Sequence, residues 1–171
     1  MRRSRVLLAV LSLACSVPTA QSEGLGEVSF RLDGELQQFR QNTSGVSLSV
    51  RGAWFTLSVA DYLREQDLSL EISLQHYQGV GTYPLGDADD RARLAIGEQV
   101  YETTGSQGRG TLTVTEASCR TEVATDPATG MTGDFEICHA RGTFSLVGVS
   151  QSGETVTLTE GTFRGTSVQG A

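Results

Sequence analysis

The clearest chemistry in this chain of 171 residues belongs to its three cysteines. Cys119 and Cys138 form an even pair once Cys15, which lies in an apolar N-terminal run, is set aside. In an exported protein two such thiols meet an oxidising compartment, so we expect a disulfide between Cys119 and Cys138. Zinc ligation by both thiols and His139 is the alternative, but a zinc site takes four ligands and the sequence has no Cys-x-x-Cys spacing.

Few other side chains are placed for acid–base or metal chemistry. His76 and His139 are the two histidines of the chain, and each lies on or beside an expected strand with no visible partner group. The GxSxG, HExxH and Walker patterns are absent. Asp87, Asp89 and Asp90 offer oxygen ligands for Ca²⁺, but the EF-hand pattern is absent, which favours a solvated acidic turn. We therefore predict no catalytic residue, no metal site and no cofactor.

One aromatic residue has a second interpretation. Trp54, the single tryptophan, could stack on a sugar ring beside Tyr62 or Tyr77. A tryptophan within a strand is more often buried because its apolar area is large, so we expect Trp54 in the core. A secreted carbohydrate-active enzyme is the last of our functional alternatives, and it would need a cleft with two facing acids or a histidine beside an acid.

The N-terminus has the features of an export signal. Residues 2–5 are basic and residues 6–14 are apolar, a run too short to span a bilayer as a helix. We assign residues 1–20 to a signal peptide. Cleavage near Ala20 is one expectation, and cleavage before Cys15 is the other.

The second cleavage site would make the protein a lipoprotein. Ala14-Cys15 resembles the end of a bacterial lipobox, in which a small residue precedes the cysteine that becomes acylated, although Cys15 also fits as an apolar member of the signal segment. Residues 16–26 are polar and non-periodic, as expected of a flexible tether. We therefore expect lipid attachment at Cys15, followed by a single all-β domain over residues 27–171.

The charge of the chain excludes several classes of function. All 13 cationic side chains are Arg, against 20 acids, and three of them precede residue 20. Without that segment the net charge is about −10, which repels nucleic-acid phosphates and anionic lipid surfaces. The absence of lysine also removes Schiff-base chemistry and a P-loop lysine. We expect no nucleic-acid partner, and contact with a membrane only through an N-terminal lipid anchor.

The candidate residues must be positioned by strands, because apolar residues alternate with polar ones along most of the chain. Gly-containing turn signals separate the alternating sets. This pattern predicts an all-β fold, an antiparallel β-sandwich or meander barrel of about nine strands, with almost no helix apart from the signal peptide. The alternating sets are Val28, Phe30, Leu32; Val46, Leu48, Val50; Phe55, Leu57, Val59; Leu68, Leu70, Ile72, Leu74; Leu112, Val114; Phe144, Leu146; and Val156, Leu158.

Two hairpins can be set in register from the sequence. If Val114 pairs with Phe144, Cys119 and Cys138 are out of register by one residue. A single bulge would bring them opposite each other. Residues 120–135 then form a long hairpin excursion closed at its base by the disulfide. The last hairpin keeps its apolar residues on one face if its loop is residues 151–153, with Gly153 left-handed.

Four Gly-Thr phrases, each followed by a large residue, begin or end the expected strands at uneven intervals. Their order, together with an opening Phe-Arg-Leu-Asp-Gly segment, resembles a family of uncharacterised bacterial exported lipoproteins over roughly residues 28–165. The resemblance implies an all-β envelope domain, and it implies no catalytic residues. The phrases are Gly81-Thr82-Tyr83, Gly110-Thr111-Leu112, Gly142-Thr143-Phe144 and Gly161-Thr162-Phe163.

These observations favour a non-catalytic protein of the bacterial envelope, lipid-anchored or free in the periplasm or outside the cell. Its β-domain would present loops or a sheet face to an unknown envelope protein or a small ligand. The main alternative is a β-barrel that carries a small apolar ligand, since eight or nine strands can close around one small molecule. A filled core would exclude that alternative.

Overall fold

The structure is a computed structural model that describes residues 26–41, 44–61, 67–105, 107–125 and 132–170. These residues form an antiparallel sheet of 11 strands and contain no helix. The predicted all-β fold is confirmed. The strands are β1 (Glu27–Leu32), β2 (Glu35–Arg40), β3 (Gly45–Arg51), β4 (Trp54–Asp61), β5 (Leu68–Leu74), β6 (Gly81–Leu85), β7 (Arg91–Ile96), β8 (Gln99–Glu102), β9 (Arg109–Thr125), β10 (Thr132–Ser150) and β11 (Thr155–Gly170).

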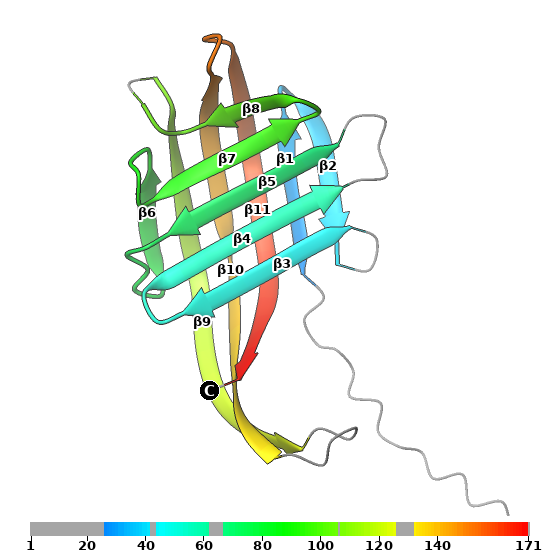
Figure 1. Cartoon of the computed structure of the whole chain (residues 1–171), viewed down its shortest axis with the longest axis vertical. Helices are drawn as coiled ribbons and strands as arrows, with labels where there is room; N and C mark the ends of the chain where they lie inside the picture. The colour runs from blue at the N-terminus through cyan, green and yellow to red at the C-terminus, as the bar shows by residue number, and fades with distance from the viewer. Residues whose placement is uncertain (1–25, 42–43, 62–66, 106, 126–131, 171) are drawn as a thin grey trace, which may run out of the picture.

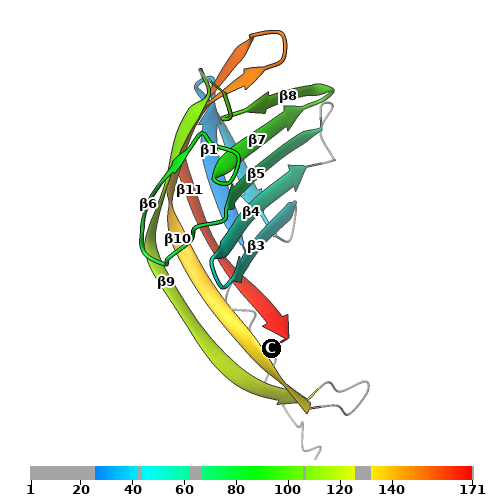
Figure 2. The same cartoon turned by 60° about the vertical axis from the view of Figure 1, so that its left-hand side comes forward.

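The sheet folds over into two layers (Figures 1 and 2). Strands β3, β4, β5, β7 and β8 make the front layer, and β2, β1, β11, β10, β9 and β6 make the back layer. The layers are joined where β8 pairs with the end of β10, through Tyr101 opposite Ser150. The path ends at β3 and β2, and the sheet does not close. Of the two predicted architectures, the sandwich is therefore correct and the barrel is wrong.

The core fills the space between the two layers. Phe55 of β4 meets Phe163 of β11 with ring centroids 5.7 Å apart, which places rings from the front and back layers in contact. Phe30 and Phe144 pack within the back layer at 6.0 Å. Every alternating set predicted from the sequence lies in a strand, with its apolar members buried or partly buried. The count of about nine was low, and none of the alternating sets lies in β2, β6, β7 or β8.

The β9–β10 ladder differs from the predicted register by two residues. Leu112, and not Val114, lies opposite Phe144. An even shift leaves every side chain on its predicted face, so the alternation pattern could not detect it. A single bulge is present as predicted, since Gly142 pairs with Val114 while its neighbour Arg141 pairs with Glu116, but the extra residue is on β9 and the predicted pairing required it on β10.

Gly142 allows the strands to approach closely at this bulge. A Cβ atom there would overlap the carbonyl oxygen of Thr113 and lie 2.7 Å from the ring of Phe163. The final hairpin follows the predicted geometry: the amide of Ser150 donates to the carbonyl of Glu154 at 2.8 Å. Gly153 in the loop between them has a φ of 86°.

Three strands continue beyond the sandwich as a curved projection, seen at the bottom of Figures 1 and 2. We call residues 115–125 of β9, 132–141 of β10 and 165–170 of β11 the arm. The predicted excursion of residues 120–135 is thus a regular ladder that pairs residue by residue as far as Thr125 opposite Thr132.

Candidate functional site

The disulfide lies within the arm and joins its two long strands. Cys119 of β9 lies directly opposite Cys138 of β10, with the two Cα atoms 4.1 Å apart. Cys138 is 2% exposed, whereas Cys119 is exposed. The predicted disulfide is confirmed, and it fastens β9 to the middle strand of the arm.

The same bond prevents the two cysteines from binding a metal ion. A carboxylate oxygen of Glu136 and both sulfurs lie within 4.8 Å of one another, but the sulfurs are bonded together and offer no thiolate to a metal. His139 is next to Cys138 along β10 and points to the opposite face. Its Nδ1 lies 2.9 Å from the hydroxyl of Thr166, so the proposed His–thiol ligand set is not assembled.

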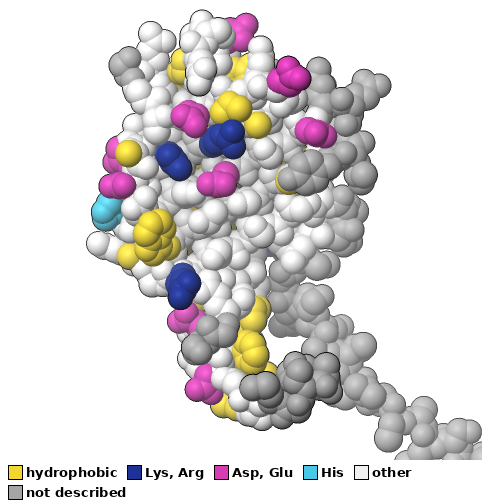
Figure 3. Space-filling view, viewed as in Figure 1, with side chains coloured by type: hydrophobic (Ala, Val, Ile, Leu, Met, Phe, Trp, Pro, Cys, Tyr) yellow, Lys and Arg dark blue, Asp and Glu magenta, His cyan; other side chains and the backbone are white. Residues whose placement is uncertain are grey.

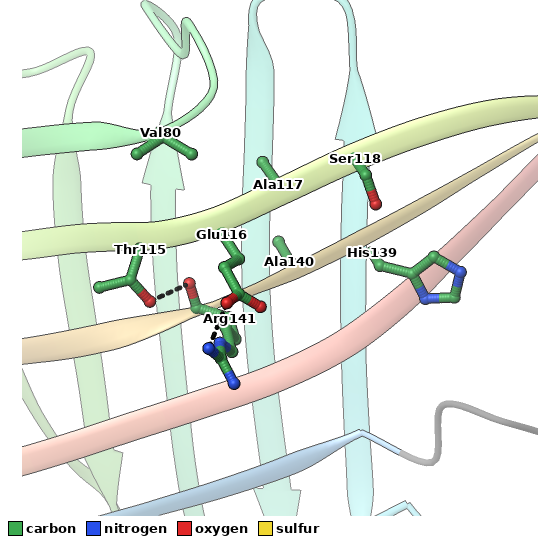
Figure 4. A pocket seen from close by; sticks show the side chains of 8 residues that line it. All are labelled: Val80, Thr115, Glu116, Ala117, Ser118, His139, Ala140 and Arg141. Carbon is green, nitrogen blue, oxygen red and sulfur yellow. Dashed lines mark hydrogen bonds and ion pairs between the residues drawn. The ribbon is translucent and has the colours of Figure 1, made fainter.

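A shallow hollow of about 410 Å³ lies at the base of the arm. Its charged side chains satisfy each other, since Arg141 donates to Glu116, and the hydroxyl of Thr115 donates to the carbonyl of Arg141 at 3.2 Å. Figure 4 shows these groups on one side of the β9–β10 pair, with Val80 beyond β9 near the start of β6. The hollow is open and its walls are two strands and the residue that precedes β6.

One backbone edge of the arm carries no neighbouring strand. β6 covers β9 only from Gly110 to Val114, where Gly81 pairs with Val114. From Thr115 to Thr125, β9 pairs with β10 on one side, and no other strand among the described residues pairs with its opposite side. We call Thr115–Thr125 the free edge. Apart from the half-buried Ala117 its side chains are exposed, so an incoming strand could reach the backbone N–H and C=O groups.

The two faces of the free edge differ in charge. Pairing with β10 places all three of its charged side chains on the outer face, away from the front layer, and gives the inner face uncharged residues. Val123 on the inner face is 72% exposed, a high value for a large apolar side chain. The outer face carries Glu116, Ser118, Arg120, Glu122 and Ala124, and the inner face carries Ala117, Cys119, Thr121, Val123 and Thr125.

The edge of β3, in contrast, is protected. The amide of Val50 donates to the hydroxyl of Ser167 at 3.3 Å, and the side-chain amide of Gln169 donates to the carbonyl of Val50 at 2.9 Å. Both partners project from β11 in the arm. Side chains of β11 thus satisfy both backbone groups of Val50 at the edge of β3. Among the described residues, no side chain makes such a hydrogen bond to the free edge.

Trp54 lies on the surface, so its predicted place in the core is wrong. Its side chain is 56% exposed at the turn between β3 and β4, opposite Arg51. The alternation already required this, since Phe55 faces the core and the residue before it must face outward. Tyr77 is buried between Phe55 and Tyr83, and burial raises the pKa of Tyr77. Tyr62 lies outside the described residues.

The carboxylates of the acidic turn accept backbone hydrogen bonds, and His76 lies beside one of them. Asp87 accepts the amides of Asp89 at 3.0 Å and Asp90 at 2.6 Å, and these bonds lower the pKa of Asp87, that of Asp90 contributing most. Asp90 is 8% exposed and accepts the amide of Gln75 at 2.8 Å. His76 lies 3.7 Å from Asp90, on the surface. These carboxylates hold the turn that precedes β7.

The predicted anchor residue Cys15, the signal peptide and the tether as far as residue 25 lie outside the described residues. Within the described part of the chain, no helix has the length and apolar character needed to cross a membrane. No protein-family model, curated protein or solved structure matches this chain.

Proposed function

We propose that this chain is a non-catalytic, exported protein of the bacterial envelope, anchored by a lipid on Cys15, whose arm binds an extended protein segment by strand addition. The N-terminal basic and apolar residues followed by Ala14-Cys15 support export and lipidation. The Cys119–Cys138 disulfide is a bond typical of oxidising compartments outside the cytosol. The resemblance to exported lipoproteins points in the same direction.

The free edge is the observation that carries the binding role. Natural proteins shorten, cover or charge their edge strands, because an unpaired edge is a template for another strand. The edge of β3 is covered in this way at Val50, by Ser167 and Gln169. The free edge is long, is held to β10 by the disulfide, and keeps its charges on one face. Main-chain hydrogen bonds would supply affinity there, and side chains on alternate positions would supply selectivity.

A carrier of a small apolar ligand is less well supported. Such a protein needs an interior space bounded by a closed sheet. Here the sheet is open and aromatic rings from the front and back layers meet in the core, with Phe55 and Phe163 centroids 5.7 Å apart.

A strand-shaped probe tests the proposal. The full chain, with its disulfide formed, is titrated with a fluorescent peptide of the Thr115–Thr125 sequence carrying Ser in place of Cys119. We expect saturable binding and slower amide exchange confined to the free edge. The matched control is the same peptide with Pro in place of Thr121 and Val123, which removes two donors. Equal binding of both peptides, or no change in exchange at saturation, would overturn strand addition.

The anchor has a separate test. Mass spectrometry of the mature protein from a bacterial host should find a diacylglyceryl group on Cys15 as the first residue. A Cys15→Ala variant should lose the modification and leave the membrane fraction. An unmodified mature N-terminus at Gln21 would contradict the anchor and leave the binding role untouched.

The exposure of Trp54 favours a second candidate function, the binding of a glycan. Trp54 is the first residue of β4 and the next residue, Phe55, is buried, so the Trp54 ring lies at one end of the outer face of the front layer. Figure 3 shows that the charged side chains in this view are scattered and do not form one continuous patch. An exposed aromatic face beside hydrogen-bonding groups such as Arg51 suits stacking on a sugar ring. Oligosaccharides should then quench or shift the tryptophan fluorescence, with loss of binding in Trp54→Ala. An unchanged spectrum with cell-wall fragments and neutral glycans would exclude this candidate.

A further inference from the structure

We propose that the segment bound at the free edge is the same segment of a second copy: two β9 strands pair antiparallel about a two-fold axis that passes through Thr121. This inference rests on the proposed strand addition and names its partner. The pairing would join two arms into one continuous sheet in the order β11-β10-β9-β9-β10-β11. It would also leave neither copy with an unpaired edge on β9, which is the usual benefit of a closed, two-fold interface.

Geometry restricts the registers in which a strand can pair with itself. In an antiparallel ladder, opposed residues project to the same face of the sheet. Outer-face residues of one copy must therefore lie opposite outer-face residues of the other. The incoming strand must also stop short of Val114, because Gly81 of β6 already pairs with it. Few registers satisfy both conditions.

The charges select among these registers. With the axis at Thr121, Arg120 of each copy lies opposite Glu122 of the other, which gives two opposite-charge pairs. Arg120 and Glu122 already form an ion pair within one copy, with Nε 2.6 Å from Oε1. The dimer would therefore gather four charges of alternating sign on the outer face at its axis. Opposite charges directly across a ladder stabilise it, and like charges destabilise it.

Neighbouring registers place like charges together or are shorter. An axis at Cys119 sets Glu116 opposite Glu122 twice. An axis at Arg120 or at Glu122 sets that residue opposite itself. An axis at Ser118 gives favourable pairs of Glu116 with Arg120, but it brings Glu122 to the position opposite Val114, which Gly81 of β6 holds.

The inner face is also complementary to itself in the Thr121 register. Val123 of one copy lies opposite Cys119 of the other, so the 72% exposed valine would cover the exposed side of the disulfide. Ala117 lies opposite Thr125, and the described strand of the second copy ends before it reaches β6. β9 brings no charge to this face, and the nearest carboxylate on β10 is that of Glu136, which lies within 4.8 Å of the two sulfurs.

Charge exchange at the axis tests the pairing. Sedimentation equilibrium of the full chain should show a monomer–dimer equilibrium. Arg120→Glu replaces both attractive pairs by repulsive ones and should raise the dimer Kd by at least about tenfold. The double variant Arg120→Glu with Glu122→Arg restores opposite charges and should recover the dimer. Arg93→Glu, the same charge reversal at an exposed position of β7 in the front layer, is the matched control and should leave Kd within about twofold.

Cysteine cross-linking reports the register directly. Thr121→Cys places two thiols across the axis and should give a covalent dimer on mild oxidation, while peptide mapping confirms that the Cys119–Cys138 bond persists. Ser118→Cys is equally exposed but is separated from its copy by about six residues along the strands, roughly 20 Å, and should not cross-link. Cross-linking of Ser118→Cys in place of Thr121→Cys would refute the Thr121 axis.

The outcomes also separate this inference from the proposed function. A chain that stays monomeric at the highest concentration, while the strand-shaped peptide still slows exchange at the free edge, would refute pairing between copies and leave strand addition standing. A monomeric chain whose free edge also ignores the peptide would refute both. Dimerisation that is indifferent to the Arg120→Glu substitution would place the contact elsewhere and overturn the inference.

Discussion

Breaking the Cys119–Cys138 bond should loosen the arm before it affects the sandwich. In the described arm, only Cys138, Ala140 and Ser167 are buried, whereas the large fully buried side chains belong to the two layers. The arm is therefore held in place mainly by its strand pairing and its disulfide, and little apolar burial contributes. The matched perturbation is Cys119→Ser with Cys138→Ala, which removes the bond without leaving a buried hydroxyl.

The size of the effect follows from the loop that the bond closes. The two cysteines are 19 residues apart in sequence, and closing a loop of that length removes chain entropy equivalent to about 3 kcal/mol. If this free energy holds the arm closed, its loss increases the open population about 100-fold, since 1.4 kcal/mol corresponds to a factor of ten. Amide exchange in the arm should accelerate by the same factor.

Hydrogen exchange read residue by residue measures this effect. Amides of β9 and β10 around Thr121 and Glu136 should exchange about 100-fold faster in the variant, while those of Leu57 and Leu70 in the front layer change much less. Circular dichroism should show the same strand content. Equal acceleration in the arm and in the front layer would show that the two unfold as one unit, and no acceleration anywhere would show that the bond is incidental.

Three further predictions concern the turns and the core. Thr103→Val removes the buried hydroxyl that accepts the amide of Ala92 at 2.9 Å, and it should lower the free energy of unfolding by about 1–3 kcal/mol in urea denaturation, while Thr103→Ser costs less. Gly142→Ala should destabilise strongly because its Cβ would overlap the backbone of β9, whereas Gly133→Ala, with nothing nearer than 3.9 Å, should be mild in the same assay. The pKa of Asp87, measured by NMR titration, should lie below its ordinary value; its contribution to stability is present above the unfolded pKa and is lost as pH falls through the folded one.

The fold class was predictable because burial on one face imposes a period of two. That constraint fixes which face of the sheet a side chain occupies, but it does not fix which residue of the next strand lies opposite. The predicted β9–β10 register could therefore be wrong by two residues while each side chain kept its face. The same rule was sufficient to place Trp54 outside, since Phe55 was assigned to the core. The large apolar area of tryptophan favours burial, but the position of Trp54 next to the buried Phe55 outweighs that tendency and leaves Trp54 exposed.

The free edge was not predictable from β9, because whether a strand has a neighbour depends on where another strand stops. β6 is a short strand, and its first residue, Gly81, lies opposite Val114. Nothing in the sequence of β9 changes at that point except that alternation of large apolar residues ceases after Val114. The weak signal was the combination of small and β-branched residues with three charges, Glu116, Arg120 and Glu122, that all fall on even-numbered positions, which is compatible with a strand that has one exposed face.

The bulge at Thr115 determines which face of the arm receives the charges. Val114 and Cys119 must both face inward, but they are an odd number of residues apart, so one extra residue is needed between them. Because the extra residue precedes Glu116, that carboxylate points outward to Arg141.

Deleting one residue on either side of Glu116 tests this placement of the bulge. Deleting Thr115 should give a regular ladder with the native pairs of Ala117 and Cys119 kept, at the cost of about one hydrogen bond to the carbonyl of Arg141. Deleting Ser118 also permits a regular ladder, but that ladder turns Glu116 inward, opposite the 5% exposed Ala140. At this half-buried position, held in the native ladder by Ala117, the carboxylate loses its ion pair with Arg141 and part of its hydration, which is more costly. Both proteins should form the disulfide, and the melting temperature should fall much further for the Ser118 deletion. Equal melting temperatures would show that the bulge does not control the orientation of Glu116.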